Sequence, residues 1–156
     1  MDEKRAPILP RWRELPDLEL YMDQVLALAE RYLGACSSPE SRGLTASMVN
    51  NYVKIGVLPA PVRKRYSRAH LARLLVICVL KPVLPIASIG RLLEAGLRDC
   101  TEEAFFDGFC ELFEQTRREM DGKPEGRDEA GAAILRAALR ARAEQDLAQR
   151  LVDELA

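Results

Sequence analysis

The sequence predicts an all-helical (all-α) protein, with a helix-turn-helix unit that carries a short wing and a helical region after it. Apolar residues recur at spacings of three and four in several segments, and capping residues, prolines or glycines bound those segments. We find no strand pattern longer than a wing. The 156 residues fit one compact domain or a small domain with a helical extension.

The first helix is expected after Pro16, with Asp17 as its N-cap and Gly34 near its end. Its apolar face is defined by residues three and four apart. These residues are Leu18, Tyr21, Met22, Val25, Leu28, Ala29 and Tyr32. Small and polar residues at 37–43 predict a loop after it.

A second, shorter helix is expected from Ala46 to Ile55, with Thr45 as its N-cap and Gly56 in the left-handed conformation at its end. Residues 57–62 contain two prolines separated by one residue, so this segment should be extended. It leads into a tight basic turn at 63–65, which predicts a loop or wing.

Ser67 is expected to cap a third helix, which runs up to Lys81 and is stopped by Pro82. His70, the only histidine, lies near its start, and we expect it at the surface or near a bound phosphate. A short amphipathic helix follows and should end at Gly96.

Two further helices complete the chain. One begins at Thr101, where Glu102 and Glu103 suit the positive end of the helix dipole, and the last begins near Ala130 after a linker. We therefore divide the chain into residues 1–96, the arm and DNA-binding unit, and residues 97–156, a helical C-terminal region for dimerisation or effector binding.

Charge is distributed unevenly along the chain. The 23 basic and 24 acidic residues give a net charge of −1, but no Asp or Glu occurs between Glu40 and Glu94. The nine basic residues of that block are Arg42, Lys54, Arg63, Lys64, Arg65, Arg68, Arg73, Lys81 and Arg91. Such asymmetry indicates a polyanionic partner, because a face that only provides solubility usually mixes both signs.

Several function classes have no support in the sequence. Glycine-rich phosphate loops are absent, and a single histidine with four cysteines outside any C-x-x-C pair gives no metal set. We expect no enzyme activity, no cofactor and no metal. The most apolar stretch has only Leu74 to Leu80 as its longest uncharged run, too short for a membrane helix, and we expect a cytoplasmic protein without a membrane partner.

The second helix has one face suited to reading DNA. Its polar members, expected to face the bases, are Ser47, Asn50, Asn51 and Lys54. An α-helix fits the major groove of B-DNA, and an Asn amide can pair with the edge of adenine. The basic turn beside this helix would lie on the phosphates.

The segments 47–61 and 64–74 together resemble the DNA-binding domain of the MerR family, a winged helix-turn-helix, over about residues 44–94. The resemblance rests on the order and spacing of Tyr52, Gly56, Leu58, Pro59, Arg65, Tyr66 and Leu71. It implies that Tyr52 and the Arg65–Tyr66 pair contact the DNA backbone. The backbone contacts that we expect are Arg42, Thr45, Tyr52, Arg63, Lys64, Arg65, Tyr66 and Arg68.

The segments 9–25 and 48–81 also resemble an uncharacterised bacterial family, domain of unknown function 1836, which carries no established activity. The function we expect is sequence-specific binding of double-stranded DNA as a transcriptional regulator. An excisionase-like factor that bends DNA and a helical adaptor that binds an acidic protein or a membrane surface remain as alternatives.

The C-terminal region supplies the candidates for self-association. All four phenylalanines fall within residues 105–113, a pattern typical of an ordinary packing face, with a dimer interface or an effector pocket as alternatives. The last helix offers Leu135, Leu139, Leu147, Leu151 and Leu155, and proteins of the MerR family pair through helices at this place. We expect a homodimer; a small-molecule effector stays possible without a specific indication.

Overall fold

The structure is a computed structural model that describes residues 9–34, 43–120 and 130–155. Within them the elements are η1 (Trp12–Glu14, a 3₁₀ helix), α1 (Met22–Leu33), α2 (Ala46–Lys54), α3 (Arg68–Leu80), α4 (Ile86–Leu97), α5 (Glu102–Glu119) and α6 (Ala130–Asp153). The only β pairing in these residues consists of two isolated antiparallel bridges. The all-helical fold class is confirmed.

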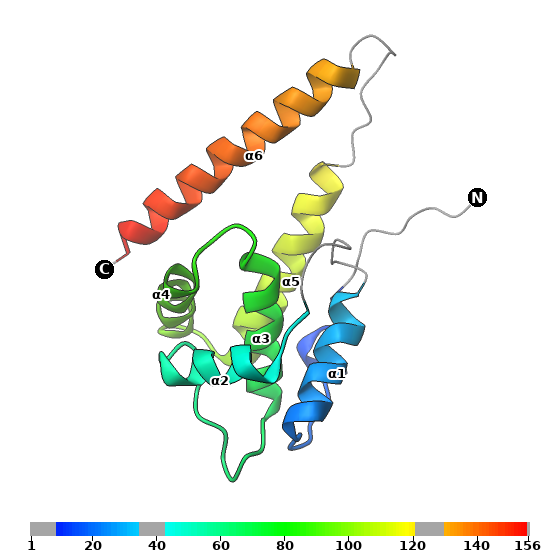
Figure 1. Cartoon of the computed structure of the whole chain (residues 1–156), viewed down its shortest axis with the longest axis vertical. Coiled ribbons are helices and arrows are strands. Elements are labelled where there is room, and N and C mark those ends of the chain that lie inside the picture. The colour runs from blue at the N-terminus through cyan, green and yellow to red at the C-terminus, as the bar shows by residue number, and fades with distance from the viewer. Residues whose placement is uncertain (1–8, 35–42, 121–129, 156) are drawn as a thin grey trace, which may run out of the picture.

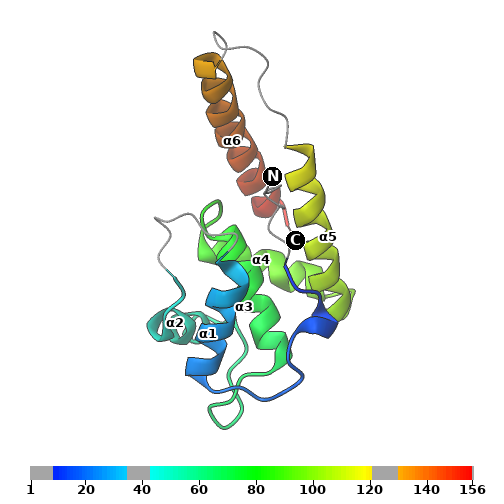
Figure 2. The same cartoon turned by 90° about the vertical axis from the view of Figure 1, so that its right-hand side faces the viewer.

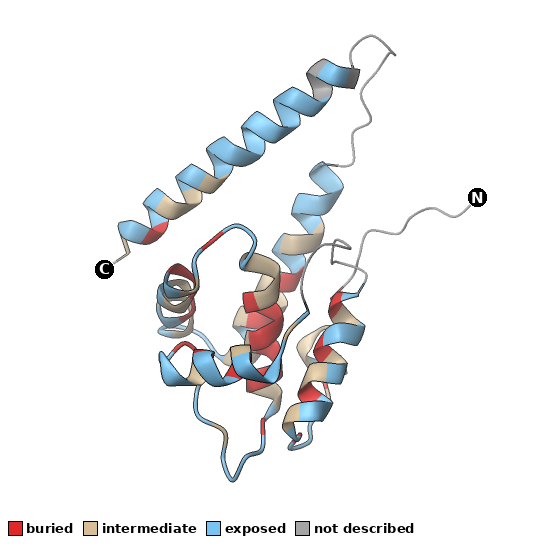
Figure 3. Ribbon diagram, viewed as in Figure 1, coloured by how far each residue is buried: buried red, intermediate tan, exposed pale blue. Residues whose placement is uncertain are grey.

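The core forms around α3. Seven of its residues are buried, namely His70, Leu71, Ala72, Leu74, Leu75, Val76 and Ile77. A helix that is apolar on all sides needs neighbours on all sides, and α1, α4 and α5 pack against it (Figure 1, Figure 2). The buried residues therefore concentrate on α3 in Figure 3.

The N-terminal segment was predicted incorrectly. The first helix begins at Met22 with Tyr21 as its N-cap, not at Leu18 after an Asp17 cap. Leu18 and Tyr21 are 68% and 51% exposed and lie outside the packing face. The cause is a pairing with a distant segment: Leu20 and Tyr66 exchange two backbone hydrogen bonds of 2.8 Å each, which keep Leu20 extended.

The predicted caps of the next two helices are confirmed. Thr45 Oγ1 accepts a hydrogen bond of 3.2 Å from the Met48 N–H, and Ser67 Oγ accepts one from the His70 N–H. Gly56 has a φ of 79°, the left-handed conformation expected at the end of α2. The ends of α2 and the start of α3 are therefore fixed by local interactions.

The expected wing is a minimal hairpin, which we call the basic hairpin (residues 62–65). The backbone groups of Val62 and Arg65 exchange hydrogen bonds of 3.1 and 3.0 Å. The two residues between them, Arg63 and Lys64, have φ values of 53° and 62°. A two-residue turn of this kind needs two left-handed residues, and non-glycine residues adopt that conformation at a cost of about 1–3 kcal/mol each.

The segment before α1 fastens α5 to the rest of the fold. The Trp12 N–H donates to Asp107 Oδ1 at 2.8 Å, and the Arg11 guanidinium pairs with Glu114 at 3.1 Å. Phe106 is 1% exposed, and the other three phenylalanines pack against the same core. The packing interpretation of the phenylalanine cluster is confirmed. Residues from both sides of position 96 contribute to this core, so the division of the chain into two regions at that position stays a prediction.

The last helix contacts the body of the protein only near its C-terminus. Val152 is buried against the core, and Gln145 Nε2 donates to the Val83 carbonyl at 2.9 Å (Figure 1). Residues 134–144 of α6 are exposed. In the described part of the chain, no helix is both long and apolar enough to cross a membrane.

Val57, just before the hairpin, packs closely on α4. A Cβ atom added at Gly90 would lie 2.9 Å from Val57 Cγ2, closer than real Cβ contacts. We expect Gly90→Ala and Val57→Ala each to lower the free energy of unfolding. The double variant should lose less than the sum of the two, by at least about 0.5 kcal/mol, because the smaller Val57 side chain makes room for the new methyl group. Urea unfolding of the four proteins measures this coupling, and strict additivity would contradict the contact.

Candidate nucleic-acid interface

The polar face of α2 points away from the core. Val49 and Tyr52 are buried, 0% and 3% exposed, and their burial fixes the rotation of the helix. The four residues expected to face the bases all lie on the opposite, exposed side: Ser47, Asn50, Asn51 and Lys54. In the described part of the chain none of their side chains makes a hydrogen bond or an ion pair. Their donors and acceptors are therefore available to a ligand.

The basic hairpin leaves the C-terminal end of α2 and returns at the start of α3 (Figure 1). Arg63 and Lys64 are exposed at its tip, and Val62 beside them is 68% exposed. A turn with two left-handed central residues usually has Asn-Gly at these positions. Here both positions carry long cationic side chains, Arg63 and Lys64. Strain of this kind is found preferentially at functional sites.

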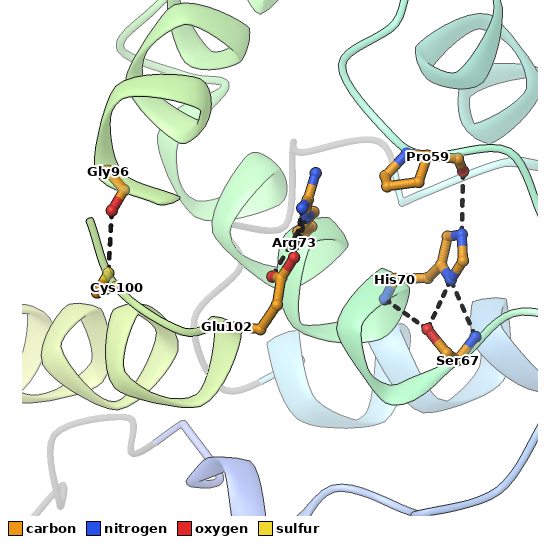
Figure 4. A network of polar contacts seen from close by, with 7 residues as sticks. All are labelled: Pro59, Ser67, His70, Arg73, Gly96, Cys100 and Glu102. Atoms are coloured by element: carbon orange, nitrogen blue, oxygen red, sulfur yellow. Dashed lines mark hydrogen bonds and ion pairs between the residues drawn. The ribbon is translucent and has the colours of Figure 1, made fainter. Parts of the chain in front are cut away.

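His70 anchors the base of the hairpin to α3, as Figure 4 shows. Its Nδ1 accepts from the Ser67 N–H at 3.0 Å, so Nε2 carries the proton and donates to the Pro59 carbonyl at 3.0 Å. Both ring nitrogens are thus used by the neutral tautomer. The expectation of a surface or phosphate-proximal histidine is wrong, because the residue is 7% exposed and spans from the N-cap to the hairpin base.

Figure 4 also shows how α3 and α4 meet the start of α5. The Arg73 guanidinium pairs with both carboxylate oxygens of Glu102, the first residue of α5. The Cys100 thiol donates to the Gly96 carbonyl at 2.9 Å. These contacts hold α3, α4 and the start of α5 together. The ion pair with Glu102 also neutralises Arg73, which is one of the cations of the basic block.

Eight of the nine cations of the basic block lie in the described residues, and they separate into two groups. Four arginines pair with carboxylates from outside the block: Arg65 with Glu19 at 3.2 Å, Arg68 with Asp17 at 3.4 Å, Arg73 with Glu102, and Arg91 with Asp153 at 3.8 Å. Lys54, Arg63, Lys64 and Lys81 have no carboxylate partner among the described residues. Three of these four unpaired cations lie at the end of α2 and the tip of the basic hairpin, whereas Lys81 lies at the end of α3 over the Tyr52 ring.

The remaining residues expected on the DNA backbone have other environments. The Tyr52 hydroxyl is buried and has no hydrogen-bond partner among the described residues, and the Lys81 ammonium lies over the Tyr52 ring, 5.7 Å from its centroid. Tyr66 is 4% exposed and its ring packs edge-on against His70. Neither tyrosine belongs to the exposed surface, because both rings complete the core below the hairpin. Thr45 is exposed but its hydroxyl caps α2, and Arg42 lies outside the described residues.

Asp17 and Glu19 are the site residues that sequence reasoning missed. They reach Arg68 and Arg65 only because the segment before α1 is extended along the hairpin base. Arg68 also lies over the Trp12 ring, 5.3 Å from its centroid. The only sequence signal for these ion pairs was the presence of two carboxylates just after Pro16, and an N-cap at Asp17 explained that pattern equally well.

Other chemistry has little support in the described residues. No group of three His, Cys, Asp or Glu residues there could hold a metal ion. Burial raises the pKa of the Cys78 and Cys110 thiols to about 11, so neither is a reactive thiolate at neutral pH. An open cleft of about 690 Å³ lies between the end of α2 and α4, and its Arg73 and Arg91 are already paired with carboxylates.

A family model described as "Domain of unknown function (DUF1836)" matches residues 10–115, about two thirds of the chain. The chain belongs to this family. The DUF1836 region begins at the segment that pairs with the hairpin base and ends inside α5. No curated protein and no solved structure matches the chain. The candidate interface lies wholly within the family's region, and the exposed half of α6 lies beyond it.

The role of His70 leads to a test by pH. Burial lowers the pKa of His70 from its ordinary value of 6.5, with Arg73 contributing in the same direction and the hydrogen bond to Pro59 opposing. The unfolded chain therefore binds a proton first as the pH falls. The contribution of neutral His70 to the free energy of unfolding should therefore be complete above about pH 6.5. Below that pH it should decrease, by at most about 1.4 kcal/mol per pH unit.

His70→Gln is the matched variant, because Gln at this position of α3 can keep the capping box with Ser67. Urea unfolding between pH 7.5 and 5.5 should show a clearly shallower loss of stability for this variant than for the wild type. The chain has no second histidine to titrate in that range. Equal pH slopes for the two proteins would mean that the neutral ring does not hold the hairpin base.

Proposed function

We propose that this protein binds double-stranded DNA in a sequence-specific manner, with α2 in the major groove and the basic hairpin on the adjacent backbone. In this proposal it acts by binding rather than by catalysis, as a bacterial transcriptional regulator of the MerR-like type. The observation that carries the proposal is that three unpaired cations of the basic block, Lys54, Arg63 and Lys64, lie beside an exposed polar helix face.

The residue chemistry of the two parts supports a division of labour. Asn50 and Asn51 on α2 can each form paired hydrogen bonds with an adenine edge, and Ser47 tolerates several bases. Arg63 and Lys64 carry positive charge at the tip of a turn held rigidly by its backbone pairing and by His70. Phosphate contacts of this kind position a protein on the duplex, and base contacts select the sequence.

The carboxylate-paired cations would contribute less. Arg65 and Arg68 could reach phosphate only by exchanging Glu19 and Asp17 for it, since each already has an acidic partner. Both ion pairs are partly exposed, and such pairs contribute about 0–1 kcal/mol to stability. Replacing the carboxylate with a phosphate would therefore cost little and would add little to the affinity for DNA. The resemblance to the MerR family over residues 44–94 is consistent with α2 as the recognition helix.

Selection of bound sequences from random duplex DNA tests the proposal. Enrichment of a defined motif, with an affinity that falls as salt rises by about 0.9 log units per log unit of salt for each phosphate contacted, would support it. Binding without any enriched motif, together with bending of the duplex, would instead favour an architectural factor. No binding at physiological salt would exclude DNA and leave an acidic protein as the partner.

Arg63→Ala/Lys64→Ala should weaken binding to the selected motif and to a scrambled duplex alike. If each side chain neutralises one phosphate, the slope of log affinity against log salt should fall in magnitude by about 1.8. Fluorescence anisotropy at several salt concentrations measures both effects. Arg31→Ala/Arg150→Ala removes the same charge from exposed positions on α1 and α6 and should leave the slope unchanged. Equal effects of the two double variants would mean that net charge, not the hairpin, drives binding.

Asn50→Ala should act differently. It removes a group that reads bases, so we expect a loss of about 1–3 kcal/mol on the selected motif and almost none on the scrambled duplex. Repeating the selection with the variant should show a relaxed preference at one or two positions of each half-site. An unchanged preference would remove Asn50 from the reading face.

A further inference from the structure

Residues 134–143 of α6 are exposed and pack against no other described part of the chain. We call residues 130–143 the α6 arm. Its large apolar side chains are strongly exposed: Ile134 69%, Leu135 64% and Leu139 69%. An isolated helix of this length is only marginally stable in water, and apolar side chains clustered on an exposed surface mark interaction sites.

The packing face of α6 continues into the arm. Positions 134, 138, 141, 145, 148, 152 and 155 alternate spacings of four and three, which is a heptad pattern. The C-terminal members, including Ala148, Val152 and Leu155, pack against the core of the same chain. Ile134 and its neighbours on this stripe are exposed. The stripe thus extends beyond the surface with which its C-terminal members pack. Leu135 and Leu139 lie off this stripe, on another exposed side of the arm that also carries Arg136 and Arg140.

The charge of the arm restricts what can cover it. Residues 130–143 contain Arg136, Arg140 and Arg142 and no Asp or Glu. Arg142 pairs with Asp146 one turn later at 3.3 Å, whereas Arg136 and Arg140 have no ion pair within the described residues. A second arm laid against this one would bring the arginines of both copies together, which is unfavourable. An acidic surface with exposed apolar residues fits the arm better.

The exposed face of α5 has these properties. α5 contains six acidic and two basic residues. Glu111 and Leu112 lie four and three positions before Gln115, and Glu119 lies four positions after it, so the four share one exposed side of the helix. Leu112 is 63% exposed, and Met120 at the end of α5 is 60% exposed. Neither Glu111 nor Glu119 has an ion pair within the described residues. A helix laid along this face also meets Gly108, where no other atom lies within 4 Å of an added Cβ.

We propose that two copies of this chain form a dimer in which the α6 arm of each packs along α5 of the other. Such an interface is reciprocal, because the arm of one copy and the α5 of the other meet twice around a two-fold axis. It buries Leu135 and Leu139 against Leu112 and Met120, with Arg136 and Arg140 on the same side of the arm facing Glu111 and Glu119. The inference does not depend on what the basic surface binds.

Charge reversal on each side tests this arrangement. The arm variant, Arg136→Glu/Arg140→Glu, and the α5 variant, Glu111→Arg/Glu119→Arg, should each be largely monomeric at a concentration where the wild type is a dimer. In an equimolar mixture both reciprocal contacts become complementary again: the reversed arm meets the reversed α5, and the wild-type arm meets the wild-type α5. Sedimentation velocity should therefore show the dimer restored in the mixture, with a dissociation constant within about tenfold of the wild type.

Two controls keep failure to fold separate from failure to pair. Circular dichroism and urea unfolding should show that both variants keep their helical content, and Arg31→Glu on α1 should leave the dimer intact. A monomeric wild type at about 100 μM, far above a typical dimer dissociation constant, would overturn the proposal. So would a dimer that the α5 variant leaves unchanged, the result expected if the arms paired with each other. A monomeric wild type that still selects a DNA motif would overturn the dimer and leave the proposed function standing.

Discussion

The burial of α3 on all sides is the constraint on which the rest of the structure depends. A helix with seven buried residues cannot lie at a surface, so α1, α4 and α5 must surround it. The segment before α1 ties this arrangement together, pairing with Tyr66 at one end and with α5 at the other. What remains outside are the polar face of α2, the basic hairpin and the α6 arm.

The same arrangement explains a charge distribution that composition conceals. Acidic segments before and after the basic block fold back onto it and neutralise four of its arginines. Of the four cations of the block left unpaired in the described residues, three lie at the end of α2 and the hairpin tip. A compact patch of this kind can steer a polyanion toward one face of a protein with a net charge of −1. In this account, charge sets the orientation of the ligand and the amides of α2 supply selectivity.

Local features could be predicted from the sequence, and distant pairings could not. Thr45, Gly56 and Ser67 were assigned correctly because caps depend on neighbours within one turn. The start of α1 was wrong because Leu20 pairs with Tyr66, 46 positions away, and nothing in the local pattern reports that bridge. His70 was misplaced for the same reason, since its second partner is the Pro59 carbonyl across the hairpin. The exposed face of α2 followed from periodicity, but the neutralisation of Arg65 and Arg68 required the fold.

The measurement that tests the central claim most directly is a map of amide chemical shifts as a selected DNA duplex is added to the ¹⁵N-labelled protein. The account predicts the largest changes at α2 and the basic hairpin, including Asn50, Lys54 and Lys64, with small changes on the exposed faces of α1 and α5. Changes centred on α4 or α5, with α2 and the hairpin unaffected, would contradict it, because the unpaired cations of α2 and the hairpin would then not lie where DNA binds.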